Sequence, residues 1–313
     1  MRLLVTGVTG YVGPLLATRL IAEGHEVRGF ARSPRRAQVA GLDMYGGDAV
    51  TGEGLAAAMD GVEVAYFLIH AMERGAPGDD PFPAREAQAA VRFADAAAAA
   101  GVRRIVYLGG PVPAAPLSSH LESRLAVERA LLAAVPDSIA LRASIVIGAR
   151  SRSFGLLVRL IERLRVLALP AWWSHRTAPI DERDVLAMLT AAAGARLPVT
   201  ERDADGGYVF DAAGADVVSY GDLLGRIAEL MLVDRSVVKL PSVSLTPVAS
   251  VVAAALAGED PALVRPLMES LETDLLPDGR SAAQALTVRL HSLDAAIEHA
   301  LHEWERTGHL AAR

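Results

Sequence analysis

The chain alternates between short apolar runs and longer stretches in which apolar residues recur every three or four positions. The runs at 3–5, 27–31, 42–45, 64–69, 105–108 and 139–147 are apolar and bounded by glycine or polar residues. Such runs are typical of strands buried in a parallel sheet. The stretches at 14–24, 54–59, 84–100 and 121–134 have the composition and spacing of helices. This alternation predicts a parallel sheet of about seven strands covered by helices on both faces.

The pattern is less regular after residue 150. A stripe of apolar residues over 154–164 predicts an amphipathic helix, and Ser219 followed by Asp222 is typical of another helix start. The adjacent Trp172 and Trp173 fall in a predicted loop. We therefore expect an α/β fold of the Rossmann type, with a doubly wound parallel sheet, in residues 1–150. A smaller, mostly helical C-terminal portion that binds substrate is expected in residues 151–313, partly interleaved with the sheet.

A glycine-rich turn follows the first predicted strand and precedes the first predicted helix. Its three glycines, Gly7, Gly10 and Gly13, have the spacing G-x-x-G-x-x-G. Gly7 permits a tight turn, Gly10 lets a ligand approach the backbone, and Gly13 allows the helix to pack closely on the strand. The helix N-terminus adds free N–H groups and the positive end of a dipole. We expect this turn to bind a dinucleotide through Thr6, Gly7, Thr9, Gly10, Tyr11, Val12 and Gly13.

The end of the second strand bears on which dinucleotide binds. An acidic residue there would bind the ribose 2′-hydroxyl of NAD, but this chain has Arg32 and Ser33, with Arg35 and Arg36 close behind. A guanidinium and a hydroxyl suit a 2′-phosphate, so we expect NADP(H) to be preferred over NAD(H). The alternative is a solvated basic turn.

The ends of the third and fourth strands supply two further candidates. Asp48 is placed to accept a hydrogen bond from the adenine amino group, or else to cap a turn. Leu68 lies beside the predicted path of the nucleotide, although an apolar residue is expected in any buried strand. We include both as candidate contacts to the nucleotide.

Composition narrows the class of protein further. The 313 residues are 52% hydrophobic and 22% charged, which favours a large core over disorder. The 31 basic and 37 acidic side chains give a net charge of −6, which argues against a nucleic-acid binder. No cysteine is present and the histidines are scattered, so no metal site is predicted. The most apolar segment, 248–257, is too short to span a membrane, and we expect a cytoplasmic protein.

Several of these pieces together resemble the extended or atypical short-chain dehydrogenase/reductase superfamily, and within it the NmrA-like NAD(P)-binding branch. They are the turn at 6–13, Gly47-Asp48, the run 102–108, and Pro179-Ile180-Asp181 followed by Asp184-Val185. The likeness covers roughly residues 1–186 and continues weakly beyond. It implies a Rossmann fold, a bound nicotinamide nucleotide and redox chemistry.

The sequence departs from the resemblance at the reacting residues. Active members of the superfamily resemble one another in a Ser and a Tyr-x-x-x-Lys pair, with the tyrosine exchanging the proton. Here the fifth strand runs into Gly109-Gly110-Pro111, and the tyrosine and lysine positions hold His120 and Arg124. In one interpretation His120 replaces tyrosine as general acid and Arg124 holds ribose or phosphate. In the other, His120 only begins a helix and Arg124 pairs with Glu128 one turn later.

The remaining candidates fall in predicted loops at the carboxyl edge of the sheet, where doubly wound folds bind ligands. His70 directly follows the fourth strand, and Trp172, Trp173 and Arg176 form an aromatic and basic cluster suited to a flat apolar substrate. The two tryptophans could equally be packing. Ser144 lies in a segment, 142–146, that resembles the one flanking nicotinamide in the superfamily.

Three functional classes follow from these observations. The first is an NADPH-dependent reductase of a small or flat apolar carbonyl, enone or quinone. The second is a non-catalytic NADP(H)-binding sensor or regulatory protein, and the third is a non-redox isomerase, dehydratase or cyclase on the same scaffold. We favour the reductase, because an apolar cleft beside nicotinamide suits hydride transfer. The expected partner is a small-molecule substrate, and the alanine-rich helices would permit a homodimer.

Overall fold

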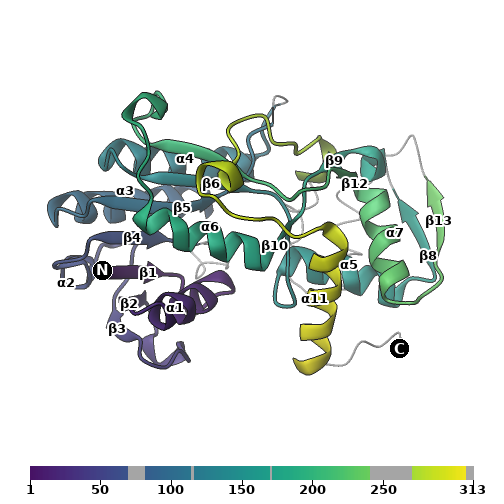
Figure 1. The fold of residues 1–313 in the computed structure, drawn as a ribbon, viewed down its shortest axis with the longest axis horizontal. Coiled ribbons are helices and arrows are strands. Elements are labelled where there is room, and N and C mark those ends of the chain that lie inside the picture. The colour runs from purple at the N-terminus through teal and green to yellow at the C-terminus, as the bar shows by residue number, and fades with distance from the viewer. Residues whose placement is uncertain (70–81, 114–115, 170, 240–269, 308–313) are drawn as a thin grey trace.

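A computed structural model describes residues 1–69, 82–113, 116–169, 171–239 and 270–307 (Figure 1). Its centre is a seven-stranded sheet with the strand order β11-β6-β5-β4-β1-β2-β3, and every pair of neighbours is parallel. The strands are β1 (Arg2–Thr6), β2 (Glu26–Ala31), β3 (Asp43–Gly46), β4 (Val64–Phe67), β5 (Arg104–Gly109), β6 (Ile139–Ala143) and β11 (Tyr208–Ala212). The predicted doubly wound, Rossmann-type sheet is confirmed.

Helices cover both faces of this sheet (Figure 1). One face packs against α1 (Val12–Ala22), α6 (Glu182–Gly194) and α10 (Ala282–Ala285). The other packs against α2 (Leu55–Met59), α3 (Phe82–Ala99) and α4 (Ser119–Ala134). The short helices η1 (Pro34–Arg36), η3 (Val199–Glu201) and η4 (Ser270–Glu272) lie in connections.

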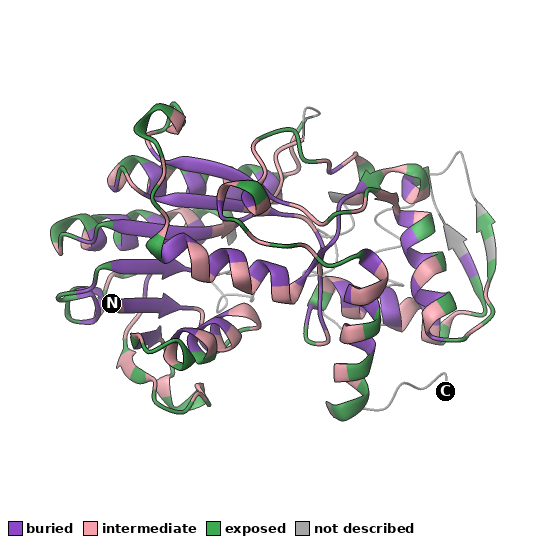
Figure 2. Cartoon of the chain, viewed as in Figure 1, coloured by how far each residue is buried: buried purple, intermediate pink, exposed green. Residues whose placement is uncertain are grey.

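Two-sided burial explains why the strands are apolar throughout instead of alternating. In β1, Leu3 and Val5 enter the core under α1 and α6, whereas Leu4 enters the core under α2 and α3. All three side chains are fully buried, and the central strands are buried along their length in Figure 2. A strand with one solvated face would need a polar residue at every second position.

The C-terminal portion builds a separate core from α5 (Arg152–Arg163), α7 (Tyr220–Leu230) and α11 (Leu293–Thr307). Three two-stranded ribbons accompany it: β7 (Val146–Ile147) with β10 (Ile180–Asp181), β8 (Val166–Leu169) with β13 (Ser236–Lys239), and β9 (Arg176–Thr177) with β12 (Val218–Ser219). The chain nevertheless returns to the sheet, because β11 adds its edge strand beside β6. The boundary between 150 and 151 stays a prediction.

Most predicted elements are found, with two local differences. The apolar run 139–147 is two strands, because the chain leaves the sheet after Ala143 and β7 pairs with β10 instead. The two tryptophans lie in a short 3-10 helix, η2 (Ala171–Ser174), where a loop was expected. The predicted helix start at Ser219 is confirmed, since its hydroxyl accepts a hydrogen bond from the backbone N–H of Asp222 at 3.0 Å.

Candidate nucleotide-binding site and its surroundings

The glycine turn between β1 and α1 is packed so closely that two of its glycines cannot carry a side chain. Gly7 has φ = +68°, and a Cβ there would lie 2.5 Å from the carbonyl oxygen of Leu68. A Cβ on Gly13 would lie 2.3 Å from the carbonyl oxygen of Gly7. Gly10 is exposed, its N–H donates to the Gly7 carbonyl at 2.9 Å, and a Cβ would reach only that oxygen, at 3.2 Å. Gly7 and Gly13 therefore shape the turn, and Gly10 presents bare backbone at its surface.

The N-terminus of α1 is open to an anion. The helix begins at Val12, its cap residue Tyr11 makes no capping hydrogen bond through its side chain, and its first turn holds no acidic residue. The first N–H groups of a helix lack intrahelical acceptors and carry the positive end of its dipole. Together with the exposed Thr9 and Gly10, this end has the donors and the space that a pyrophosphate requires, so the residues present fit a dinucleotide.

Thr6 holds the turn against the neighbouring strand. Its side chain is fully buried, and its hydroxyl donates to the carbonyl of Tyr66 at 2.9 Å and accepts from the N–H of Leu68 at 3.0 Å. The hydroxyl thus joins the ends of β1 and β4 and fixes the Leu68 carbonyl over Gly7. Thr6 therefore positions the turn.

The basic residues expected to select the nucleotide lie together at the end of β2. Arg32 and Ser33 are exposed immediately after the strand, and Arg35 and Arg36 are exposed on η1. Asp48 follows β3, and one of its carboxylate oxygens accepts from the N–H of Val50 at 2.8 Å. Asp48 therefore caps its own turn, as the alternative interpretation held.

His120 and Arg124 occupy the first two turns of α4. His120 is partly buried, and the helix start is capped by Ser118, whose hydroxyl accepts from the N–H of Leu121 at 3.3 Å. Arg124 is buried, and its guanidinium donates to the Leu108 carbonyl at the end of β5 and to the Glu86 carboxylate at 3.3 Å. The expected alternative pairing of Arg124 with Glu128 is wrong.

Glu128 instead pairs with an arginine from the sheet. Arg142 on β6 donates to both oxygens of Glu128, at 2.6 and 3.0 Å. Arg142 is also the register partner of Asp211 on β11, and Asp211 accepts from the N–H of Gly279 at 2.6 Å. Burial raises the pKa of Asp211 above its ordinary value. The chain therefore places paired charges, in place of a tyrosine and a lysine, between α4 and the carboxyl ends of β5, β6 and β11.

Tyr11 reaches away from the glycine turn. Its phenol donates to the carboxylate of Glu182, the first residue of α6, at 2.5 Å, and both groups lie against Gly148. Burial and the negative charge of Glu182 raise the pKa of Tyr11 well above its ordinary value. The phenol therefore favours its protonated form and is held on α6 by Glu182.

The structure separates the other sequence candidates. Trp172 is 5% exposed within the C-terminal core and meets Tyr220 edge to face at 6.2 Å, whereas Trp173 is half-buried at the margin of that core. The exposed Arg176 forms an ion pair with Asp274 at 2.9 Å. The Ser144 hydroxyl donates to the carbonyl of Ala178 at 2.9 Å. His70 lies outside the described residues.

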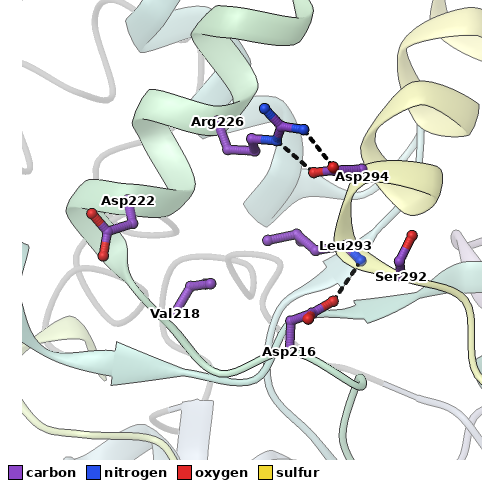
Figure 3. A pocket seen from close by; sticks show the side chains of 7 residues that line it. All are labelled: Asp216, Val218, Asp222, Arg226, Ser292, Leu293 and Asp294. Atoms are coloured by element: carbon purple, nitrogen blue, oxygen red, sulfur yellow. Dashed lines mark hydrogen bonds and ion pairs between the residues drawn. The ribbon is translucent and has the colours of Figure 1, made fainter.

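A surface hollow of about 340 Å³ opens elsewhere, between β12, α7 and the start of α11 (Figure 3). Within it, Arg226 forms an ion pair with Asp294, and Asp216 accepts from the N–H of Leu293 at 2.8 Å. No residue of the glycine turn lines the hollow. We therefore do not identify it with the nucleotide site.

Across the residues that the structure describes, no group of three or more histidine, aspartate or glutamate side chains could hold a metal ion. Among the described helices, none combines the length and the apolar composition that crossing a membrane requires.

Sequence reasoning missed the acidic partners of this region. Glu86 is fully buried on α3, accepts a hydrogen bond from the hydroxyl of Ser123 at 2.6 Å and pairs with Arg124. In the sequence it is one charged residue in an alanine-rich helix, and nothing nearby distinguishes it from a solvent-exposed one. Glu182 and its contact with Tyr11 were missed because the two residues are 171 positions apart. The one available signal was the group of acidic residues Asp181, Glu182 and Asp184, of which Asp181 and Asp184 belong to the resemblance.

Comparison with known proteins agrees with the N-terminal part of this picture. Residues 7–122 match a family model described as NAD(P)H-binding. Over 113 residues the chain is 34% identical to a 3 beta-hydroxysteroid dehydrogenase/Delta 5-->4-isomerase of Mycobacterium tuberculosis, a match that spans 34% of this chain and 30% of the relative.

Solved structures match over the whole chain at lower identity. A short-chain dehydrogenase/reductase superfamily protein from Agrobacterium tumefaciens with bound NAD superposes with a TM-score of 0.69 at 21% identity, covering 98% of each chain. A UDP-glucuronic acid 4-epimerase from Bacillus cereus in complex with NAD superposes with a TM-score of 0.71 at 14% identity, covering 98% of this chain and 99% of the other. These likenesses show the fold. The family match adds that residues 7–122 are similar to NAD(P)H-binding proteins, as the sequence predicted for this part of the chain.

Proposed function

We propose that the protein is an NADPH-dependent reductase of a flat, largely apolar carbonyl, enone or quinone. The proposal starts from the match of residues 7–122 to a family model described as NAD(P)H-binding. The observation that carries the proposal is the glycine turn, with its bare backbone at Gly10 and the uncapped start of α1. When bound, the reduced nicotinamide supplies a hydride.

The preference for NADPH rests on the end of β2. Arg32, Ser33, Arg35 and Arg36 are exposed there, and the strand ends without an acidic residue that would favour a ribose hydroxyl. An arginine binds a phosphate through paired, charge-assisted hydrogen bonds that a hydroxyl cannot replace.

The cytoplasmic localisation that we expect from the composition stays a prediction.

Arg32→Asp tests this preference. One charge-assisted contact contributes about 1.5–3 kcal/mol, so NADPH affinity is expected to fall by about 10-fold or more while NADH affinity changes little. Arg196→Asp, which reverses an exposed arginine just after α6, is the matched control. Isothermal titration of both nucleotides gives the answer, and equal losses for NADPH and NADH would reject the role of Arg32.

The proton is assigned to His120. An imidazole titrates near neutral pH, so it can donate a proton to the oxygen that develops negative charge and regain one from solvent. Arg124 cannot transfer a proton to the substrate, because a guanidinium stays protonated. Its described contacts, to Glu86 and to the Leu108 carbonyl, suit a role in holding α4 against β5.

The substrate class rests on two observations. The relative from Mycobacterium tuberculosis is named for a steroid, which is a flat and apolar molecule. In this chain Trp173 is half-buried and packs against the margin of the C-terminal core, and Trp172 is a core residue. Aromatic side chains at the margin of a core are the kind of group that lines sites for flat apolar ligands.

Turnover with a panel of quinones, enones and 3-ketosteroids tests the reductase. Product formation should be matched by loss of NADPH absorbance, and His120→Ala should abolish both while leaving NADPH affinity nearly intact. His302→Ala, at an exposed position on α11, is the control. Unchanged turnover in the His120 variant would reject its role as acid.

A second function, a nucleotide-binding sensor without turnover, is favoured by one observation. Arg124, which stands where the lysine is expected, makes internal contacts to Glu86 and to the Leu108 carbonyl. A sensor would bind NADPH and NADP with different consequences for a partner and consume neither. A non-redox enzyme would convert its substrate with no change in the NADPH absorbance.

A further inference from the structure

The first turn of α6 touches two parts of the molecule that are far apart in sequence. On one side, the Glu182 carboxylate accepts from the phenol of Tyr11, which is the cap residue of α1 and belongs to the glycine turn. The contact is tightly fitted, because a Cβ on Gly148 would lie 1.9 Å from the Tyr11 hydroxyl and 2.3 Å from a Glu182 oxygen. Only a glycine at 148 leaves room for this pair.

On the other side, three consecutive residues of α6 contact α11 or the segment that leads into it. Glu182 lies 3.8 Å from Nε2 of His299, and the Arg183 guanidinium donates to the carbonyl of Ala295 at 3.2 Å. Asp184, which is 1% exposed, accepts from the N–H of His291 at 2.8 Å and contacts its ring at 2.5 Å. The helix start is itself fixed, since Asp181 caps it through the N–H of Arg183 at 2.7 Å.

We infer that the first turn of α6 is a joint that couples nucleotide binding at the glycine turn to the packing of α11, with Tyr11 as the positioning residue. This inference rests on the proposed nucleotide binding. It adds a role for Asp181 and Asp184, which the resemblance marked and the binding of the nucleotide leaves unexplained.

The coupling starts at the backbone of Tyr11. An anion bound at the start of α1 fixes the peptide groups around Gly10, Tyr11 and Val12, and so reduces the freedom of the Tyr11 side chain. The phenol then holds the Glu182 carboxylate in place over Gly148. Because Glu182, Arg183 and Asp184 lie in one helical turn, holding Glu182 also holds the contacts to α11. Ordering that is shared in this way gives positive coupling between the two regions.

Hydrogen exchange of the full-length protein with and without saturating NADPH tests the joint. In the wild type, NADPH should slow exchange in the glycine turn and also in α11, the latter by about 5-fold or more. Tyr11→Phe keeps the backbone of the turn and the ring but removes the hydrogen bond to Glu182. At an NADPH concentration that saturates this variant, the glycine turn should be protected and α11 should not. Tyr208→Phe is the matched control, because it removes a phenol hydrogen bond to the Leu197 carbonyl at the far edge of the sheet.

A second variant guards against a purely local effect. Glu182→Ala removes the contact to Tyr11 and the contact to His299, and should also abolish the response of α11; if it does not fold, Tyr11→Phe alone decides. Protection of α11 that is equal in Tyr11→Phe and wild type would overturn the joint while leaving nucleotide binding intact. No protection of α11 in the wild type would do the same. Failure of the wild type to bind any nicotinamide nucleotide would instead refute the proposed function and the joint with it.

Discussion

Replacing single glycines separates the residues that shape the turn from the one that faces the ligand. Gly13→Ala would place a Cβ 2.3 Å from the Gly7 carbonyl oxygen, 2.6 Å from the Gly7 carbonyl carbon and 2.9 Å from the Val8 nitrogen. All three are backbone atoms at the end of β1, so none can move aside by rotating a side chain. Gly10→Ala would meet only the Gly7 oxygen, at 3.2 Å.

The magnitudes decide the sign for each variant. Alanine is better than glycine inside a helix by about 1 kcal/mol, and overpacking a tight site costs about 1–3 kcal/mol. Because the atoms that Gly13→Ala meets are backbone, the upper part of that range applies, and we expect a net loss of about 1–2 kcal/mol in the free energy of unfolding. Gly225→Ala is the matched control. It lies in α7 with nothing within 4 Å of the added Cβ, and should stabilise the protein by about 0.5–1 kcal/mol.

Gly10→Ala should change stability by less than about 1 kcal/mol but weaken NADPH binding by about 10-fold or more, because its methyl group occupies the surface that the pyrophosphate approaches. Urea unfolding and isothermal titration measure the two quantities. Wild-type NADPH affinity in Gly10→Ala would refute the assignment of the turn as the nucleotide site. A Gly13→Ala protein as stable as Gly225→Ala would refute the packing argument.

Three further predictions concern the buried polar groups and the C-terminal core. Burial raises the pKa of Asp211, so the folded chain binds the proton of this carboxyl group more tightly than the unfolded chain. The stability that the protonated carboxyl group contributes is therefore present at low pH and is lost as the pH rises through the raised pKa. Asp211→Asn should raise the melting temperature at pH 7 but leave it unchanged at about pH 3. Arg142→Met leaves Glu128 buried without its partner and should cost about 3 kcal/mol in urea unfolding, most of which Arg142→Met/Glu128→Leu should recover; a double variant no better than the single one would contradict this. Trp172→Ala should lower the free energy of unfolding by about 3–5 kcal/mol, because Trp172 is a core residue. A loss of substrate affinity without a loss of stability would instead show that Trp172 contacts the substrate.

The sequence could predict the glycine turn because every determinant of that turn is local. The spacing of Gly7, Gly10 and Gly13, a buried strand before them and a helix after them are all visible within the first 22 residues. The sheet was predictable for the same reason, since burial on both faces leaves an unbroken apolar run in each strand. Only the run 139–147 misled, because nothing local marks where a chain leaves one sheet to pair in another ribbon.

The partners of the charged residues could not be predicted, because they are set by packing between distant elements. Spacing along α4 favoured Glu128 as the partner of Arg124. In the fold, Glu86 from α3 lies fully buried against Arg124, and Arg142 from β6 takes Glu128. A buried carboxylate must be paired with a positive charge. The arginine that the fold brings next to it therefore forms the pair, even when another arginine is nearer in the sequence.

Direct titration of the purified protein with NADPH and with NADH, at one fixed salt concentration, tests the central claim that the glycine turn is a nicotinamide nucleotide site. We predict that both nucleotides bind one per chain, that NADPH binds more tightly than NADH, and that Gly10→Ala weakens both. Binding of neither nucleotide, or binding that Gly10→Ala leaves unchanged, would contradict the claim.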